Sequence, residues 1–86
     1  VFVIKNEHGL HARPSAVLVN EVKKYNASVA VQNLDRNSQL VSAKSLMKIV
    51  ALGVVKGTRL RFVATGDEAQ QAIDGIGAVI ESGLGE

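Results

Sequence analysis

Apolar residues recur along this chain at spacings that change several times, and each spacing predicts a different kind of element. Residues 1–4 form a short apolar run rich in β-branched side chains, which predicts a buried strand. After the polar loop of residues 5–9, apolar side chains return at helical spacing, and we expect the first helix over residues 12–24. Pro14 suits the first turn of that helix, where a residue needs no N–H for an intrahelical bond.

Two strands joined by a turn are predicted next. Val29 and Val31 alternate with less apolar neighbours, which predicts a second strand. The Asp, Asn and Ser residues within 35–38 favour a turn, and a third strand is expected near residues 39–41. The second and third strands are therefore predicted to pair as a hairpin.

The rest of the chain predicts a short helix, a strand and a long helix. Ser45 is suited to cap a helix over residues 46–52, and Gly53 is suited to end it. Leu60, Phe62 and Ala64 alternate with Arg59, Arg61 and Val63, as expected of a strand with one face in water. Residues 66–68 open the last helix with acids in its first turn. The apolar face of this helix consists of Ala69, Ala72, Ile73, Ile76 and Ile80.

The resulting element order, βαββαβα, determines the expected fold class. A central hairpin, together with helices that are each apolar on one side, favours an antiparallel sheet covered by helices on one face. We therefore expect an α+β fold, an open-faced β-sandwich with four antiparallel strands and three helices on one face.

Length and composition narrow the class of protein. Eighty-six residues are enough for one domain with a single core. The sequence has no cysteine, so neither disulfides nor a thiolate metal site is expected. It contains no apolar run of the roughly 20 residues that a membrane helix needs and no secretory leader. Direct membrane insertion is therefore not expected, and a cytoplasmic location is the default.

Charge is divided unevenly along the chain. The formal net charge is +2, but all ten Lys and Arg residues lie within residues 1–66, together with three carboxylates. Residues 67–86 hold the other five carboxylates. Such a separation suits docking to an acidic partner or an anionic substrate, and a solvated dipole without function is an equal alternative.

The segment His8-Gly9-Leu10-His11-Ala12-Arg13-Pro14 holds the most distinctive chemistry in the chain. It places His11 at the expected start of the first helix, where free backbone N–H groups and the positive end of the helix dipole attract anions. The guanidinium of Arg13 adds a cation that can bind two phosphate oxygens at once. A neutral imidazole offers a nucleophilic nitrogen, so His11 is suited to carry a phosphoryl group.

This segment resembles the active-site loop of the HPr family, the phosphocarriers of the bacterial sugar phosphotransferase system. A second segment, Ser42-Ala43-Lys44-Ser45-Leu46-Met47-Lys48-Ile49, resembles that family's second signature, and Leu52-Gly53 and Lys56-Gly57-Thr58 continue the match. The resemblance is strongest to the HPr-like domains of fructose-specific diphosphoryl transfer proteins. It implies that residues 1–86 are a single phosphocarrier domain excised from a longer multidomain chain.

The resemblance also implies roles for particular residues and partners. His11 would be the phosphorylated residue, and Arg13 with the backbone amides of Ala12 and Arg13 would bind the phosphate. The donor would be enzyme I, and the acceptor would be the IIA domain of a sugar-specific permease, expected to be that of the fructose system. The domain would act as a monomeric, stoichiometric carrier rather than as an enzyme, with no cofactor of its own.

A partner surface is implied by the same resemblance. It would consist of Ala16, Val17, Leu46, Met47 and Val50, ringed by the cations of Arg13, Lys23, Lys44 and Lys48. Leu46 and Val50 could instead be half-buried core residues, while Ile49 is expected to point to the core. Met47 is the better candidate for an interface, because its flexible thioether adapts to more than one partner.

Three polar residues have simpler interpretations beside the functional ones. His11 could merely cap the helix, and His8 could be a solvated loop residue rather than a group that orients the loop or bonds near His11. Ser45 matches the position that is phosphorylated for regulation in some HPr proteins, but a role as helix cap already accounts for its hydroxyl.

Two other classes of function compete with phosphoryl transfer. A regulatory module of the same fold, which binds proteins without relaying phosphate, would not need His11. Nucleic-acid binding is suggested by the basic isoelectric point and the mixed element order, but the chain has only three aromatic residues for bases to stack on. Phe62 is moreover expected to face the core.

A specific metal site is not expected either. Two histidines without any cysteine do not complete a zinc site.

Overall fold

The structure, a computed structural model that describes residues 1–85, contains four strands and three α-helices in the predicted order. The strands are β1 (Phe2–Val3), β2 (Ser28–Asn33), β3 (Val41–Ser42) and β4 (Arg59–Thr65). The α-helices are α1 (Ala12–Val22), α2 (Leu46–Ala51) and α3 (Ala69–Glu81), and a 3₁₀ turn, η1 (Leu34–Arg36), follows β2.

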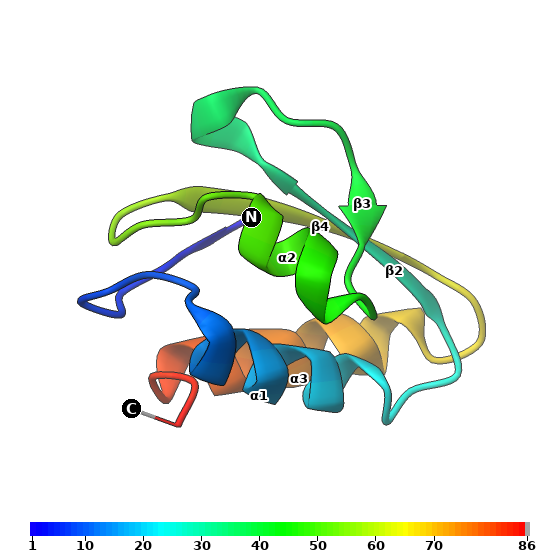
Figure 1. Cartoon of the computed structure of the whole chain (residues 1–86). Helices are drawn as coiled ribbons and strands as arrows, with labels where there is room; N and C mark the ends of the chain where they lie inside the picture. Colours follow the sequence, from blue (N-terminus) through cyan, green and yellow to red (C-terminus); the bar gives the residue numbers. More distant parts are fainter. Residues whose placement is uncertain (86) are drawn as a thin grey trace.

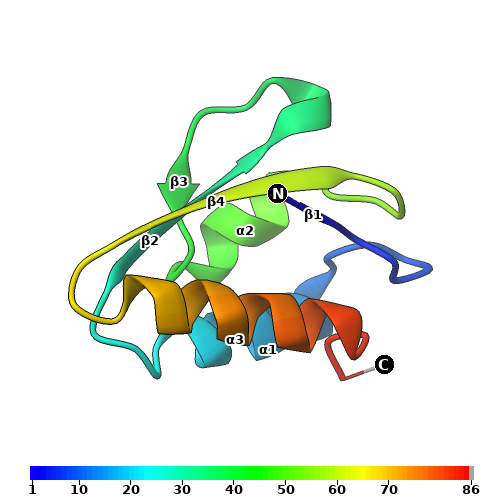
Figure 2. The same cartoon turned by 180° about the vertical axis from the view of Figure 1, so that it is seen from behind.

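All four strands form one antiparallel sheet with the order β1-β4-β2-β3. The three α-helices lie on the same face of this sheet, and the other face is open (Figures 1 and 2). The α+β open-faced sandwich predicted from the sequence is therefore confirmed, including the hairpin of the second and third strands.

The pairing of β2 with β4 forms the centre of the sheet. It runs over six residue pairs, from Ser28 opposite Thr65 to Asn33 opposite Leu60. Because side chains alternate between the two faces of a strand, Val31 and its partner Phe62 both turn toward the helices and are buried. The burial of Phe62 confirms the orientation predicted from its charged neighbours.

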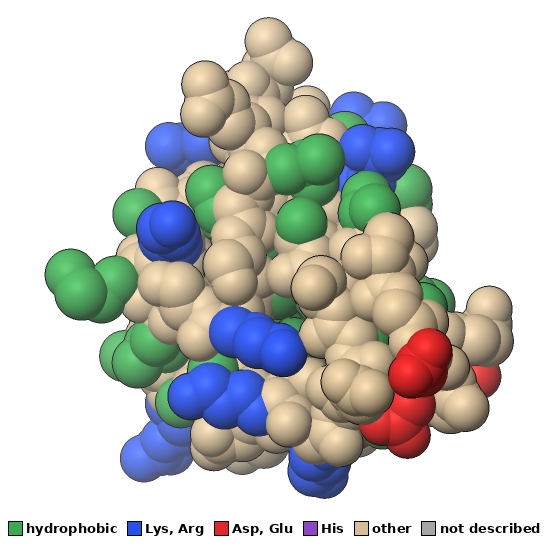
Figure 3. Space-filling view, turned by 90° about the vertical axis from the view of Figure 1, so that its right-hand side faces the viewer, with side chains coloured by type: hydrophobic (Ala, Val, Ile, Leu, Met, Phe, Trp, Pro, Cys, Tyr) green, Lys and Arg blue, Asp and Glu red, His purple; other side chains and the backbone are tan. Residues whose placement is uncertain are grey.

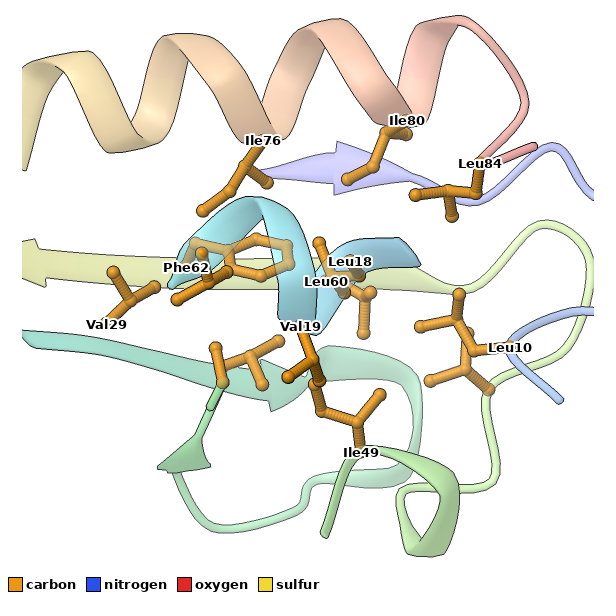
Figure 4. Packing of buried hydrophobic residues seen from close by; sticks show 14 of the residues in the cluster. Leu10, Leu18, Val19, Val29, Ile49, Leu60, Phe62, Ile76, Ile80 and Leu84 are labelled. Atoms are coloured by element: carbon orange, nitrogen blue, oxygen red, sulfur yellow. The ribbon is translucent and has the colours of Figure 1, made fainter. Parts of the chain in front are cut away.

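Buried side chains from all three α-helices meet over this face of the sheet. Figure 4 shows them converging from α1 (Leu18 and Val19), α2 (Ile49) and α3 (Ile76 and Ile80). Leu10, just before α1, and Leu84, beyond α3, join the same cluster and are almost completely buried. The core therefore extends to the start of α1, and this fixes where that helix begins.

The first strand differs from the expectation of a buried strand over residues 1–4. Only Phe2 and Val3 pair with β4, and Val1 and Val3 are exposed while Ile4 is fully buried. The physical reason is that helices cover only one face of the sheet, so every second side chain of β1 turns to the open face. A run of apolar residues in such a sheet need not be buried on both faces.

Several element boundaries also differ from the predicted ones. The first helix ends at Val22 rather than at residue 24, and the third strand covers residues 41–42 rather than 39–41. The second helix ends at Ala51, one residue early, and Gly53 follows its cap residue with a φ of +66°. Short edge strands and fraying helix ends depend on tertiary pairing, so local pattern places them only to within a few residues.

The acidic residues before the last helix do not lie in its first turn, as had been expected. The helix begins at Ala69, and Glu68 takes the N-cap position without a capping hydrogen bond from its side chain. The Glu68 carboxylate accepts a hydrogen bond from the backbone N–H of Asn26 at 2.6 Å instead. It therefore ties the start of α3 to the loop between α1 and β2.

A buried carboxylate, Glu21, lies where α1 approaches α3. Its oxygens accept hydrogen bonds from the hydroxyl of Tyr25 at 2.7 Å and from Nζ of Lys24 at 2.9 Å. These donors, the tyrosine first, lower the pKa of Glu21 below its ordinary value. Gly75 on α3 faces the pair, and a Cβ there would overlap the Tyr25 hydroxyl and the Glu21 carboxylate. The absence of a side chain at residue 75 thus allows the two helices to approach.

Candidate functional site

The loop that precedes α1 is fastened to distant parts of the fold. The side-chain amide of Asn6 donates a hydrogen bond to the carbonyl of Gly83 at 2.7 Å, and Leu10 N–H donates to the carbonyl of Val54 at 3.1 Å. Gly9 has a φ of +68°, and a Cβ there would collide with the Val54 carbonyl oxygen. The two histidines that flank Gly9 and Leu10 are therefore held by backbone contacts.

The two histidines could be identified from the sequence, but the residues that position them could not. Asn6 and Gly83 are 77 residues apart, and no periodicity connects them. The one available signal was Gly9 in a polar loop, since a glycine there is compatible with a left-handed backbone or a close approach. Which backbone it approaches could not be inferred from the residues alone.

The start of α1 leaves backbone donors available next to His11. His11 takes the N-cap position with an extended backbone, and its side chain makes no capping hydrogen bond. The first intrahelical bond runs from Ser15 N–H to the His11 carbonyl at 3.1 Å. The N–H groups of Ala12 and Arg13 thus precede the first intrahelical donor, and Pro14 has no N–H. The helix begins without using the His11 imidazole as a cap.

The two histidines and the arginine of this region are accessible to solvent. His8, His11 and Arg13 are exposed, as is Ala12 between the last two. The imidazole rings of His8 and His11 lie 6.4 Å apart between their centroids and are tilted by 58°. The exposed start of α1 therefore carries an imidazole, a guanidinium and the positive end of a helix dipole. This set of groups can stabilise the charge of a phosphoryl group while a large partner reaches it.

The second helix presents an apolar surface on its outer side. Met47 is 84% exposed, and Leu46 and Val50 are 40% and 42% exposed, whereas Ile49 is fully buried. The predicted division of this helix into a core side and an outer side is confirmed. The predicted cap is confirmed as well, because Ser45 Oγ accepts a hydrogen bond from Lys48 N–H at 3.3 Å.

The first helix contributes less to this surface. Ala16 and Val17 are only partly exposed, and Val17 packs against the buried core. Arg13, Lys23, Lys44 and Lys48 are exposed around the two helices. Figure 3 shows Lys and Arg side chains spread over one face, from its upper corners to its centre and lower left, with Asp and Glu confined to its lower right. The uneven charge of the sequence is thus also uneven on the folded surface.

Residues 1–85 contain no group of three or more His, Asp or Glu side chains that could hold a metal ion. None of the helices in this part of the chain is both long and apolar enough to cross a membrane.

Comparison with known proteins places this geometry in a family. The family described as "PTS HPr component phosphorylation site" matches residues 1–82, which is nearly the whole chain. The chain belongs to the HPr family. The phosphocarrier protein HPr of Vibrio cholerae is 40% identical over 91% of this chain and 88% of its own length. The crystal structure of HPr-C-His from Thermoanaerobacter tengcongensis is 39% identical, with a TM-score of 0.89 over 99% of this chain and 92% of that one.

Longer relatives contain a domain similar to this one. The multiphosphoryl transfer protein of Haemophilus influenzae is 96% identical over all 86 residues, which make up 17% of that protein. The corresponding protein of Salmonella typhimurium is 55% identical over 99% of the chain, and the match covers 23% of its length. The chain therefore spans only about a fifth of the multiphosphoryl transfer proteins that it matches. Within these longer proteins, the matched region corresponds to the HPr phosphocarrier domain.

Proposed function

We propose that His11 of this HPr domain accepts a phosphoryl group from the phosphohistidine of an enzyme I and passes it to a histidine of a sugar-specific IIA domain. An unprotonated ring nitrogen of His11 attacks the phosphorus, and the bond from phosphorus to the donor nitrogen breaks. The electron pair of that bond returns to the donor imidazole. The same exchange then runs with His11 as the donor. Because one P–N bond replaces another, the domain needs no cofactor and acts as a stoichiometric carrier.

One observation supports this proposal above the others: an exposed imidazole stands at the N-cap of α1, beside Arg13 and the amides of the first turn. The amides of Ala12 and Arg13 and the Arg13 guanidinium are suited to bind the oxygens of a phosphoryl group on His11. A purely regulatory module that only binds proteins would have no use for this combination of nucleophile and anion site.

We further propose that the apolar outer side of α2, centred on Met47, is where enzyme I and the IIA domain dock in turn. An exposed apolar patch with cations around it is suited to a partner surface that is apolar and acidic. Ala16 and Val17 would add the exposed parts of their side chains at its margin. Modification of Ser45 would place a phosphate on the residue that caps this helix.

Phosphorylation by purified enzyme I, with magnesium and phosphoenolpyruvate, tests the assignment of His11. We expect the protein to gain one phosphate that is labile in acid and stable in base, as a phosphoramidate is. The His11→Ala variant should fold normally, since the side chain is exposed, and should gain none. An acid-labile phosphate on the His11→Ala variant would refute the site, and a wild-type protein that gains none would favour the regulatory module.

The role of Arg13 has its own test in the rate of that reaction. Arg13→Ala should slow phosphoryl transfer and leave the melting temperature unchanged, because the side chain is exposed. Arg13→Lys should recover part of the rate, since lysine keeps the charge but lacks the two-pronged geometry. Equal rates for the three proteins would remove Arg13 from the mechanism.

We propose in addition that the domain works as part of a longer chain that serves a fructose system. The small share of the multiphosphoryl transfer proteins that it matches supports this proposal. The sequence of the complete reading frame tests it, because a IIA-type domain in the same chain would identify a fused transfer protein. The expected cytoplasmic location and monomeric state stay predictions.

A further inference from the structure

A second imidazole, that of His8, stands beside the proposed phosphoryl acceptor, and the relay as described gives it no task. The His8 and His11 rings are 6.4 Å apart between centroids, and both residues are exposed. Two exposed imidazoles at this separation can both reach the same small anion, one through a bond to phosphorus and the other through a hydrogen bond. A phosphoryl group attached to His11 would therefore come within reach of the His8 ring.

We propose that His8 is a second anion-binding residue of the site, whose ring N–H donates a hydrogen bond to a phosphoryl oxygen on His11. This inference rests on the phosphorylation of His11 proposed above. His8 is not the nucleophile in this scheme, because it lies outside the helix start that supplies backbone donors. Its contribution is to hold the phosphoryl group after the transfer.

The loop that carries His8 is ordered before any phosphate arrives. Gly9 N–H donates to the Asn6 carbonyl at 3.0 Å, which closes a tight turn around Glu7 and His8. Asn6 is buried and tied to Gly83, and Leu10 N–H is tied to Val54. A donor on a loop fastened at both ends binds an anion at a smaller entropic cost than a donor on a free loop.

Charged side chains from several parts of the fold surround His8. Lys5 and Glu7 line the same hollow as His8, and Lys5 is ion-paired at 3.0 Å with Glu81 of α3. On the α1 side the charged or titratable neighbours in sequence are His11 and Arg13. Histidine is the side chain among these that ordinarily changes charge near neutral pH.

The proposal predicts a measurable link between phosphorylation of His11 and protonation of His8. If protonated His8 binds the phosphoryl group, phosphorylation of His11 must raise the pH at which His8 titrates. An exposed ion pair of ordinary strength predicts an upward shift of about half a pH unit. The shift can be measured by NMR titration of the His8 ring in the 86-residue protein, before and after phosphorylation by enzyme I.

Variants of the loop provide a second measurement, the rate at which phospho-His11 hydrolyses as a function of pH. His8→Asn keeps a neutral donor but cannot become a cation, so its rate profile should lack one titration step of the wild type. Near neutral pH the rate constant should differ from that of the wild type by about two- to fivefold. Glu7→Gln, an exposed neighbour on the same turn, is the matched control and should keep both the step and the NMR shift.

The possible results distinguish a failure of the role proposed for His8 from a failure of the proposed carrier function. If wild-type protein gains phosphate on His11 but the His8 titration does not move, and His8→Asn keeps the wild-type profile, the role of His8 is refuted while the carrier function stands. If enzyme I transfers no phosphate to His11, the carrier function fails and the inference fails with it. A shift in the wild type that Glu7→Gln retains supports the inference.

Discussion

Substitution of Gly9 by alanine tests whether contacts with a distant backbone hold the proposed phosphoryl site in place. Gly9 has a φ of +68°, and its missing Cβ would overlap the carbonyl oxygen of Val54 and the Cα of Val55. Both atoms belong to the main chain, so no rotation of a side chain can relieve the overlap. The loop must lift, and the hydrogen bond from Leu10 N–H to Val54 must lengthen or break.

The expected loss of stability is the sum of two effects. A non-glycine residue in the left-handed region costs about 1–2 kcal/mol, and loss of one backbone hydrogen bond costs about 1–2 kcal/mol more. We therefore expect Gly9→Ala to lower the free energy of unfolding by about 2–4 kcal/mol. For a domain of this size, that corresponds to a fall in melting temperature of about 10–25 °C.

Gly57 is the matched control for this experiment. It also has a positive φ, +89°, but a Cβ added there meets nothing within 4 Å. Gly57→Ala should therefore cost only the backbone strain of about 1–2 kcal/mol and should leave phosphoryl transfer unchanged. Gly9→Ala should in addition lower kcat/KM with enzyme I by at least about tenfold, because the histidines move with the loop.

Thermal unfolding and phosphorylation kinetics, measured on both the Gly9→Ala and the Gly57→Ala protein, test this reasoning. The reasoning would be refuted if Gly9→Ala and Gly57→Ala melted at the same temperature and accepted phosphate at the same rate. Equal melting with unequal rates would show that the loop moves without loss of the Leu10 bond, and the energy assigned to that bond would be wrong.

Three further substitutions test the packing, the partner surface and the charges. Met47→Asp should weaken docking to enzyme I and raise KM, with a change in unfolding free energy within about 0.5 kcal/mol; a large fall in melting temperature would instead assign Met47 to the core. Gly75→Ala should lower the free energy of unfolding by about 1 kcal/mol, despite the better helix propensity of alanine. The loss should be smaller when Tyr25 is replaced by Phe, and a double-mutant cycle of unfolding free energies measures the difference. Asp35→Asn should destabilise the protein at neutral pH, because hydrogen bonds from the backbone and guanidinium of Arg59 lower the pKa of Asp35. A group with a lowered pKa stabilises the fold above its unfolded pKa and ceases to do so as the pH falls through its folded pKa, so denaturant unfolding of the two proteins should converge in acid.

The order of the elements could be predicted from the sequence because each long element carries its own periodicity. Helix α3 has apolar residues at helical spacing along its whole length, and β4 alternates between exposed and buried residues from Arg59 to Phe62. The edge strands β1 and β3 each contain only two paired residues, so their extents depend on neighbours in the sheet rather than on local preference. This is why the errors fall at the edges of the sheet and at helix ends.

The reactive residues of the candidate site could be predicted from the sequence, but the contacts that position them could not. His11, Arg13 and the helix start lie within three residues, so their proximity follows from local structure. The neighbourhood of His8 depends instead on a glycine that approaches a distant backbone and on the bond from Asn6 to Gly83. Contacts between residues so far apart in sequence leave no local pattern.

Exposed and buried residues alternate through the site, so reactivity can be changed by mutation without changing the stability of the fold. His8, His11 and Arg13 are exposed, while Leu10 and Ser15 between and beside them are buried. Ser15 also donates a hydrogen bond from its hydroxyl to the Leu10 carbonyl at 3.0 Å, which joins the loop to the helix. Removal of an exposed member should therefore change the fate of the phosphoryl group and leave folding intact. Removal of a buried member should lower stability and displace the exposed members together. A carrier that meets two partners in turn needs this arrangement, because its reactive side chains must be accessible and yet fixed in position.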